Sequence, residues 1–244
     1  MLPGLHHYEE FQDVLSSYSV SEDSKKILYG LKFVLLLGPS SGGRNTIIRH
    51  QVQTGRYYYV ISDTTRPPRL NDGILEQDGV EYWFRTEEEM LEDLRAGRFL
   101  EAELIHGQQV SGLSIRELAK AHRHNKIAIA DVDLKGIHAI VKIKPDTFVI
   151  MVLPPSFDEW QSRLNKRGVM ALEEQRRRLM TAQRIFEDGL KQDYYHYIIS
   201  EDVERSSGII DDILNGGANP HQEKGRALLE ELLVSLRRKL TDLG

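Results

Sequence analysis

The sequence of 244 residues contains no cysteine, which excludes disulfide bonds, thiolate metal sites and cysteine nucleophiles together. Long apolar runs are also missing. The longest, Phe148 to Leu153, is far shorter than the roughly 20 residues that a membrane-spanning helix needs. The N-terminal residues lack the basic and then apolar pattern of a secretory signal. We therefore expect a cytoplasmic protein that has no membrane partner and is stabilised by packing.

A basic excess is missing as well. The chain carries 32 Lys and Arg residues against 37 Asp and Glu residues, for a formal net charge of -5. A general nucleic-acid-binding protein usually has the opposite balance, so we predict no nucleic-acid partner. Hydrophobic residues make up 40% and charged residues 28%, which are ordinary values for a globular protein. The length allows one large domain or one domain with appendages.

From Phe33 onward, short β-rich runs alternate with patterns of helical spacing. This alternation is typical of an α/β fold, in which helices cover a parallel sheet. The expected strands are Phe33–Leu37, Tyr57–Ile61, Phe99–Ile105, Ile127–Val132, Phe148–Leu153 and His196–Ser200. Capping boxes, in which a hydroxyl and a glutamate satisfy helix N–H groups, predict helix starts at Thr86/Glu89, Ser114/Glu117 and Ser156/Glu159. Glycines predict helix ends at Gly55, Gly97 and Gly168.

Both ends of the chain are expected to extend the main domain. Residues 1–32 place apolar side chains at roughly helical spacing, which predicts a helical appendage. Residues 215–222, NGGANPHQ, have the composition of a turn-rich linker. Residues 223–244 then show leucines at helical spacing opposite a charged face. We expect a C-terminal helix that packs on the body of the protein or on a second subunit, which leaves open a homodimer through the terminal helices.

Residues 38–46, GPSSGGRNT, join the apolar run FVLLL to a helical pattern. In such a loop, glycines let successive backbone N–H groups converge on an anion, and the helix N-terminus adds partial positive charge. We therefore predict a nucleotide phosphate site, with a merely structural glycine turn as the alternative for this segment taken alone. The candidate ATP-binding residues are Gly38, Ser40, Ser41, Gly42, Gly43, Arg44, Asn45 and Thr46.

The loop departs from the phosphate-binding pattern G-x-x-x-x-G-K-[ST] at its last two positions, where Arg44 and Asn45 stand. Thr46 lies one place later. The guanidinium of arginine is planar and bulky and directs its N–H donors along fixed directions, whereas the ammonium of lysine is compact. The exchange at Arg44 is therefore not conservative. Asn45 still offers an oxygen toward Mg²⁺, although less naturally than a hydroxyl does.

Two later segments, SDTTRPPR at 62–69 and EQDGVEYWF at 76–84, resemble the monophosphate site of the guanylate kinase family. DVDLKG at 131–136 and NKRG at 165–168 also fit, and the resemblance covers about residues 33–214. It implies a P-loop NTPase-like parallel sheet flanked by helices, an inserted monophosphate-binding subdomain at about 62–125, and a mobile lid at about 163–179. It also implies phosphoryl transfer from ATP to GMP or dGMP, with Mg²⁺ as cofactor.

The resemblance assigns roles to individual residues. Ser62, Arg66, Arg69 and Tyr82 match the ligands of the GMP phosphate, and two arginines can offer bidentate donors to a dianion. Glu101 and Asp133 match the carboxylates that read guanine. The remaining matches are Glu76 at an acidic position that Asp72 could also fill, Ser114 as a guanine contact or a helix cap, Arg44, Arg167 and Arg178 as catalytic residues, and Asp131 with Asn45 or Thr46 near Mg²⁺.

The chain also departs from the family pattern. Residues 70–75, LNDGIL, form an insertion, Ser111 stands where the family has a phosphate-binding tyrosine, and Ser200 replaces an asparagine near the adenine site. Two alternatives to a GMP kinase therefore stay open. One is a catalytically weak or inactive binding module, which Arg44 and Asn45 favour. The other is a family kinase with a different phosphate acceptor, against which the pair of Glu101 and Asp133 argues.

Overall fold

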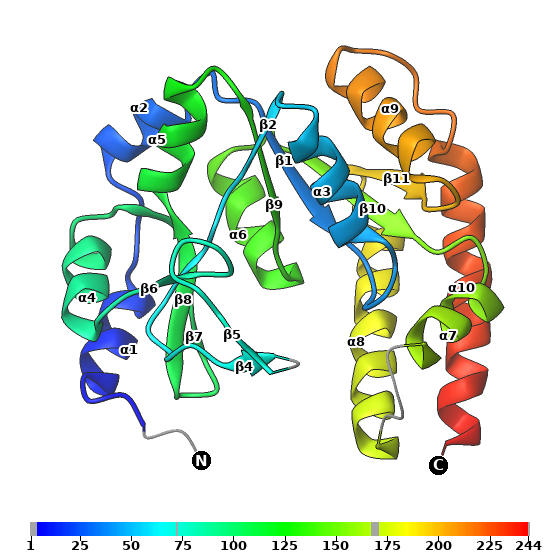
Figure 1. Cartoon of the computed structure of the whole chain (residues 1–244), viewed down its shortest axis with the longest axis horizontal. Coiled ribbons are helices and arrows are strands. Elements are labelled where there is room, and N and C mark those ends of the chain that lie inside the picture. Colours follow the sequence, from blue (N-terminus) through cyan, green and yellow to red (C-terminus); the bar gives the residue numbers. More distant parts are fainter. Residues whose placement is uncertain (1–3, 72, 167–170, 244) are drawn as a thin grey trace. The chain divides into compact units, whose positions relative to one another are not determined.

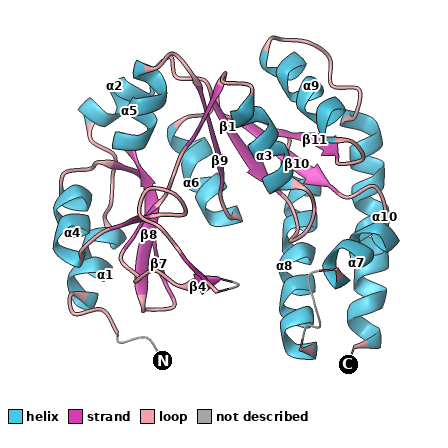
Figure 2. Cartoon of the chain, viewed as in Figure 1, coloured by secondary structure: helices cyan, strands magenta, loops and turns pink. Residues whose placement is uncertain are grey.

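The computed structural model describes residues 4–71, 73–166 and 171–243. The chain divides into two compact units. The first comprises Met1–Lys32, Tyr57–Ala128 and His138–Asp146, and the second comprises Phe33–Arg56, Ile129–Ile137 and Thr147–Gly244. Figure 1 follows the chain by colour, and Figure 2 distinguishes its helices from its strands. Within the described residues, no helix combines the length and the apolar character that crossing a membrane requires.

The first unit is built on short strands. They are β2 (Tyr57–Tyr59), β3 (Asp63–Thr64), β4 (Leu70–Asn71), β5 (Ile74–Leu75), β6 (Trp83–Phe84), β7 (Phe99–Ile105) and β8 (Gln109–Ser114). Strands β6, β3, β8 and β7 form one sheet in that order, while β4 pairs with β5 in a separate two-stranded sheet. Strand β8 is antiparallel to both β7 and β3, whereas β3 is parallel to β6. The unit also contains helices α1 (Tyr8–Ser16), α2 (Glu22–Leu28), α4 (Glu87–Arg95) and α5 (Ile115–Arg123).

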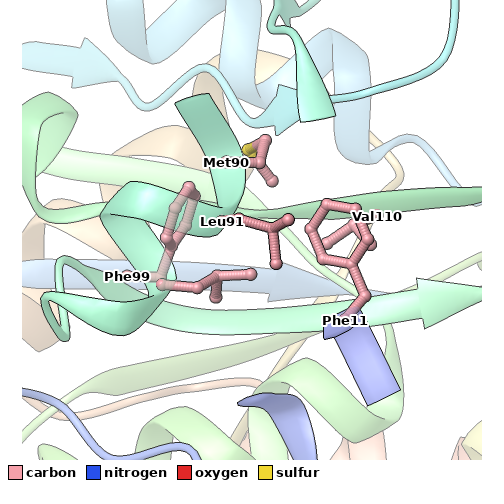
Figure 3. Close-up of a cluster of buried hydrophobic side chains, with 6 residues drawn as sticks. Phe11, Met90, Leu91, Phe99 and Val110 are labelled. Carbon is pink, nitrogen blue, oxygen red and sulfur yellow. The ribbon is translucent and has the colours of Figure 1, made fainter. Parts of the chain in front are cut away.

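The N-terminal helix α1 takes part in the core of the first unit. Figure 3 shows Phe11 of α1 in one cluster with Met90 and Leu91 of α4, Phe99 of β7 and Val110 of β8. Each of these residues is at most 2% exposed to solvent. A large side chain buried this fully contributes about 1.5 to 3 kcal/mol to the free energy of unfolding. The predicted N-terminal appendage thus supplies part of a hydrophobic core.

The second unit holds most of a parallel sheet. Its strand order is β11-β10-β1-β9-β2, in which β1 spans Phe33–Leu37, β9 Ile127–Asp131, β10 Phe148–Leu153 and β11 Tyr195–Ile199. Strand β10 is parallel to both of its neighbours, β1 and β11. Its helices are α3 (Arg44–Gln53), α7 (Phe157–Asn165), α8 (Leu172–Lys191), α9 (Val203–Leu214) and α10 (Gln222–Asp242). Helix α6 (Leu134–Ile143) is divided between the units, since its residues from His138 onward belong to the first. The predicted α/β fold, a parallel sheet flanked by helices, is confirmed.

Several local predictions agree with the structure. The bounds expected for β1, β7 and β10 are those observed, and the other expected strands differ by one or two residues at an end. The capping box at Thr86 and Glu89 is complete, whereas at Ser156 the hydroxyl accepts the bond expected from the Glu159 N–H. Gly55 and Gly97 follow helices with positive φ angles of 78° and 63°, as left-handed stop residues do. The predicted stop at Gly168 lies outside the described residues.

A helix begins at Ile115, directly after Ser114, as predicted, but the capping box expected between Ser114 and Glu117 does not form. Ser114 precedes α5, but its side chain makes no capping hydrogen bond. It ends strand β8, and its hydroxyl donates across 3.4 Å to Asp63 Oδ1. The Glu117 carboxylate instead accepts a bond of 2.9 Å from the Tyr58 hydroxyl. Tertiary partners have therefore replaced the local pairing that the spacing predicted.

Helix α10 packs on the second unit, alongside α8 and strand β11 (Figure 1). Its buried face includes Leu229, Leu232 and Leu236. Gly225 allows the close approach to β11, because a Cβ atom added there would lie 2.3 Å from the Cβ of Tyr197. Packing on the body, one of the two alternatives expected for this helix, is therefore observed, and a homodimer through the terminal helices stays a prediction.

Side chains from residues 219–222 cover the edge strand β11. The Asn219 amide donates to Tyr197 O at 3.1 Å, and Gln222 both donates to Tyr195 O at 2.9 Å and accepts from Tyr197 N–H at 3.3 Å. His221 Nδ1 accepts from the Ile199 N–H at 3.1 Å. An exposed edge strand offers its backbone groups to other chains, so these side chains protect the edge.

This contact makes the stability of the protein sensitive to acid. Burial lowers the pKa of His221 below 6.5, Arg205 and Lys224 lower it further, and Glu201 opposes them. Because the folded pKa is the lower one, the contribution of His221 is fully present above about pH 6.5 and is lost as the pH falls through the folded pKa. We expect the thermal midpoint of the wild type to fall by a few degrees more than that of His221→Gln between about pH 7.5 and pH 5.5. Equal falls in calorimetric scans would contradict this assignment.

Candidate functional site

The loop between β1 and α3 has the backbone of an anion site. Gly43 is the N-cap of α3 with a φ angle of 106°, and Ser41 is also left-handed with a φ angle of 61°. A left-handed conformation suits glycine, and alternating hands turn successive N–H groups toward one concavity. At Gly38, an added Cβ would lie 2.4 Å from Val152 O in β10. Only glycine therefore fits at Gly38 without displacing the backbone of the sheet.

A cavity of about 480 Å³ opens over this loop, and the residues that line it all belong to the second unit. The predicted phosphate-binding residues from Ser40 to Thr46 line it together with Arg163, Lys166 and Ser200. The first N–H groups of a helix have no intrahelical partner and carry partial positive charge. The side chains of Asn45 and Thr46, at the start of α3, are exposed. The cavity therefore combines room, backbone amide donors and basic side chains, as a nucleotide phosphate chain requires.

Arg44 and Asp131 come together in the second unit. Arg44 Nη1 lies 3.9 Å from Asp131 Oδ2, and the two side chains are 23% and 28% exposed. Asp131 ends strand β9 and Arg44 begins α3, so two rigid elements position the pair. A guanidinium has five N–H donors in a planar fork, so one arginine is able to serve a carboxylate and a phosphate oxygen at the same time. The arginine at the lysine position thus lies within ion-pair distance of the carboxylate that ends β9.

Asp133 lies two residues beyond Asp131 and is exposed. Its Oδ1 accepts a hydrogen bond of 2.9 Å from the Gly136 N–H, and its carbonyl accepts one from Ile137. These are the bonds of a residue that caps the start of α6. Within the part of the chain that the structure describes, its Oδ2 makes no hydrogen bond, so Asp133 can cap α6 and accept from a ligand at the same time.

In the first unit, Arg66 is held by Glu76. The guanidinium donates to both carboxylate oxygens of Glu76, with 2.9 Å between Nη2 and Oε1, and the two side chains are only 5% and 7% exposed. The Arg66 guanidinium also lies 4.6 Å from the centroid of the Tyr82 ring. Glu76 additionally accepts from the Arg69 N–H at 2.9 Å. One carboxylate thus orders a segment that carries both arginines.

The other predicted phosphate ligands of this unit are more accessible. The Arg69 side chain is exposed and makes a long contact of 3.4 Å with Gln109. Ser62 is partly buried, and its carbonyl accepts from the Trp83 N–H. Ser111, at the position of the family's tyrosine, shares a hydrogen bond of 2.7 Å with the Thr64 hydroxyl. Arg69 therefore has the exposure that a phosphate ligand needs.

The two predicted guanine contacts of the first unit have neighbours within it. Glu101 Oε1 accepts from the Leu113 N–H at 3.2 Å and is partly exposed. Ser114 is 2% exposed and faces Asp63, which is fully buried. Sequence reasoning missed Asp63, which accepts bonds of 2.8 Å from Arg85 and from Arg116. Burial raises the pKa of Asp63 to about 6, against the opposing effect of its two arginines. The only hint in the sequence was the position of this aspartate inside the segment SDTTR, which the monophosphate-site motif contains.

The basic residues of the expected lid have different surroundings. Arg167 lies outside the described residues. In α8, Arg178 Nε donates to Glu174 at 2.7 Å, and Arg177 donates to the same carboxylate. In α7, Arg163 is partly buried and donates to Ser200. Arg163, at the start of the expected lid, is therefore anchored to Ser200.

Comparisons with known proteins agree with this arrangement. A family model described as "Guanylate kinase" matches residues 30–215. The guanylate kinase of Corynebacterium diphtheriae is 33% identical over 187 residues, which are 76% of this chain and 95% of that protein. That of Corynebacterium jeikeium is 31% identical over 185 residues, covering 75% and 95%. In fold, the chain is similar to the crystal structure of guanylate kinase from Anaplasma phagocytophilum, with a TM-score of 0.53, 21% identity, and coverage of 77% of this chain and 85% of that one. The chain belongs to the guanylate kinase family.

Proposed function

We propose that the protein transfers the terminal phosphoryl group of ATP to GMP, giving ADP and GDP. The observation that carries the proposal is the loop of a guanylate kinase family member, which opens into a cavity of about 480 Å³ that Arg44 helps to line. Phosphoryl transfer needs positioning and charge stabilisation rather than covalent chemistry by the protein. Loop amides and an arginine are groups that supply both.

In this proposal, N–H groups of the loop, among them those of Ser41 and Gly43, and the Arg44 guanidinium hold the phosphates of ATP. Arg66, Arg69, Ser62 and Tyr82 hold the phosphate of GMP, which the paired arginines suit as bidentate donors. Glu101 and Asp133 accept from the guanine N–H groups. Arg167 and Arg178 stabilise the charge of the transferring group. Ser114 is buried against Asp63, so it would contact guanine only after its hydroxyl turns away.

The family uses ATP together with Mg²⁺, and the donor set is compatible with this ion. Within the described residues, no group of three or more histidine, aspartate or glutamate side chains gathers into a metal site. Mg²⁺ usually takes most of its ligands from phosphates and water and only one or two from protein oxygens. Thr46, Asn45 and Asp131 offer a hydroxyl, an amide oxygen and a carboxylate near the loop. These residues would hold the ion, which would supply positive charge that offsets the charge of the phosphates.

The proposal predicts which acceptor the enzyme uses. Purified protein with ATP and Mg²⁺ is expected to release ADP with GMP or dGMP, and much more slowly with AMP, CMP or UMP. Coupled detection of ADP release measures each rate. Tight GMP binding without turnover would refute the kinase reading and support a binding module, which the exchange at Arg44 would explain. Turnover with an acceptor other than a guanine nucleotide would refute the assignment of Glu101 and Asp133.

A further inference from the structure

Two side chains from outside the phosphate loop donate hydrogen bonds to its backbone carbonyl oxygens. Trp160 Nε1, in α7, donates to Ser40 O at 2.8 Å. Ser200, just beyond β11, donates from its hydroxyl to Gly42 O at 2.7 Å. The two acceptors are two residues apart, so the peptide group that joins Ser40 to Ser41 and the one that joins Gly42 to Gly43 are both anchored. All of these residues lie in the second unit.

Both anchors are themselves fixed. The Trp160 side chain is fully buried and packs edge-on against Phe157 and Phe186, with ring centroids 5.8 Å away in each case. Arg163 donates to the Ser200 hydroxyl at 2.9 Å and to the Ser200 carbonyl at 3.0 Å. Because the hydroxyl accepts from Arg163, its own proton is directed to Gly42 O. The positions of the donors therefore do not depend on the loop.

Anchoring a carbonyl also orients the next amide. The peptide group is planar and trans, so its C=O and its N–H point in opposite directions. Fixing Ser40 O aims the Ser41 N–H, and fixing Gly42 O aims the Gly43 N–H. Within the described residues, neither of these N–H groups has a recorded protein acceptor. Ser41 and Gly43 both line the cavity over the loop.

We infer that Trp160 and Ser200, with Arg163 behind Ser200, are positioning residues that aim two loop amides at the phosphates of the donor nucleotide. The inference deepens the proposed function, on which it rests for the identity of that nucleotide. The fit around Ser200 is close, since a Cβ atom added to Gly43 would lie 2.9 Å from the Ser200 Cβ. Small displacements of Ser200 therefore reach the backbone that carries the anion site.

The test measures ATP affinity and GMP affinity separately by calorimetry. A hydrogen bond typically contributes about 0.5 to 1.5 kcal/mol, so Trp160→Phe and Ser200→Ala are each expected to weaken ATP binding by about 3-fold to 10-fold. The affinity for GMP, whose predicted phosphate ligands lie in the first unit, should stay within the error of the wild type. Ser200→Thr keeps the hydroxyl and should retain more ATP affinity than Ser200→Ala. Ser162→Ala, on the same helix as Trp160, is the matched control and should change neither affinity.

Unchanged ATP affinity in both Trp160→Phe and Ser200→Ala would overturn the inference. Equal losses for ATP and GMP, accompanied by a lower thermal midpoint, would also overturn it, because they would indicate a general defect of folding. The proposed function fails separately: a wild type that binds ATP but does not phosphorylate GMP refutes the GMP kinase and leaves the ATP measurements valid. A wild type without measurable ATP affinity would overturn both.

Discussion

Replacing Arg44 by alanine is expected to lower kcat for GDP formation by about 10²-fold to 10³-fold, the usual loss when a group that stabilises transition-state charge is removed. Arg44 belongs to the cavity over the phosphate loop and is positioned by Asp131, with 3.9 Å between Nη1 and Oδ2. Alanine removes the charge and leaves the backbone of the loop in place. Steady-state rates with ATP and GMP, compared with the thermal midpoint, measure the effect.

The substitution Arg44→Lys shows whether the guanidinium is a working group. A lysine has a compact ammonium and cannot present a planar fork to Asp131 and a phosphate together. We therefore expect a loss of about tenfold in kcat. A gain would show that this loop is a degraded form of a lysine-bearing one. Arg56→Ala is the control, because it removes an exposed pair with Asp211 in the same unit and should leave the rate within about twofold.

Replacing Glu76 by alanine is expected to lower the free energy of unfolding by about 3 to 5 kcal/mol, the cost of leaving a buried charge without its partner. Arg66 is 5% exposed, and both oxygens of Glu76 accept from its guanidinium. The same change releases the Arg69 N–H from its acceptor. Arg66 and Arg69, two predicted ligands of the GMP phosphate, thus lose a hydrogen-bond acceptor that they share. The KM for GMP is therefore expected to rise by at least about tenfold.

Urea unfolding and the KM for GMP measure these two effects of Glu76→Ala. Glu76→Gln keeps the shape of the side chain and removes its charge, so its loss of stability should be smaller. Glu92→Gln is the control, because Glu92 is 79% exposed and lies 3.9 Å from Arg98. It should change stability by less than about 1 kcal/mol. If Glu76→Ala unfolds at the same urea concentration as the wild type, Glu76 does not hold Arg66 in solution.

The sequence predicted the parts of the site that depend on neighbouring residues. The loop at residues 38–46 was identifiable because a strand, a set of glycines and a helix follow one another directly. The strands at 33–37, 99–105 and 148–153 were predicted with the observed bounds because their apolar runs are continuous and flanked by polar residues or turns. We expected Glu76 rather than Asp72 to fill the acidic position of the monophosphate site. Glu76 does pair with Arg66, whereas Asp72 lies outside the described residues.

Predictions that required distant partners were less complete. Asp63 was overlooked because nothing adjacent to it indicates that Arg85 and Arg116 will meet it. The cap at Ser114 was wrong because the same hydroxyl had a partner 51 positions away, at Asp63. Arg163 was grouped with the basic lid because the spacing of basic residues along the sequence does not indicate which of them will find a partner in the core, as Arg163 does at Ser200.

The sequence by itself thus determined the order of the elements, the family, and the kind of ligand that the loop accepts, because spacing and glycine content act over a few residues. Only the tertiary structure decided how the loop is held. Ser200 lies 158 positions from the carbonyl that it anchors, and Trp160 lies 120 positions from its own acceptor. A hydrogen bond forms between groups that packing brings within about 3 Å, and separation along the chain does not encode that distance. The same reason explains Arg44, whose partner Asp131 became evident only when β9 and α3 were placed together.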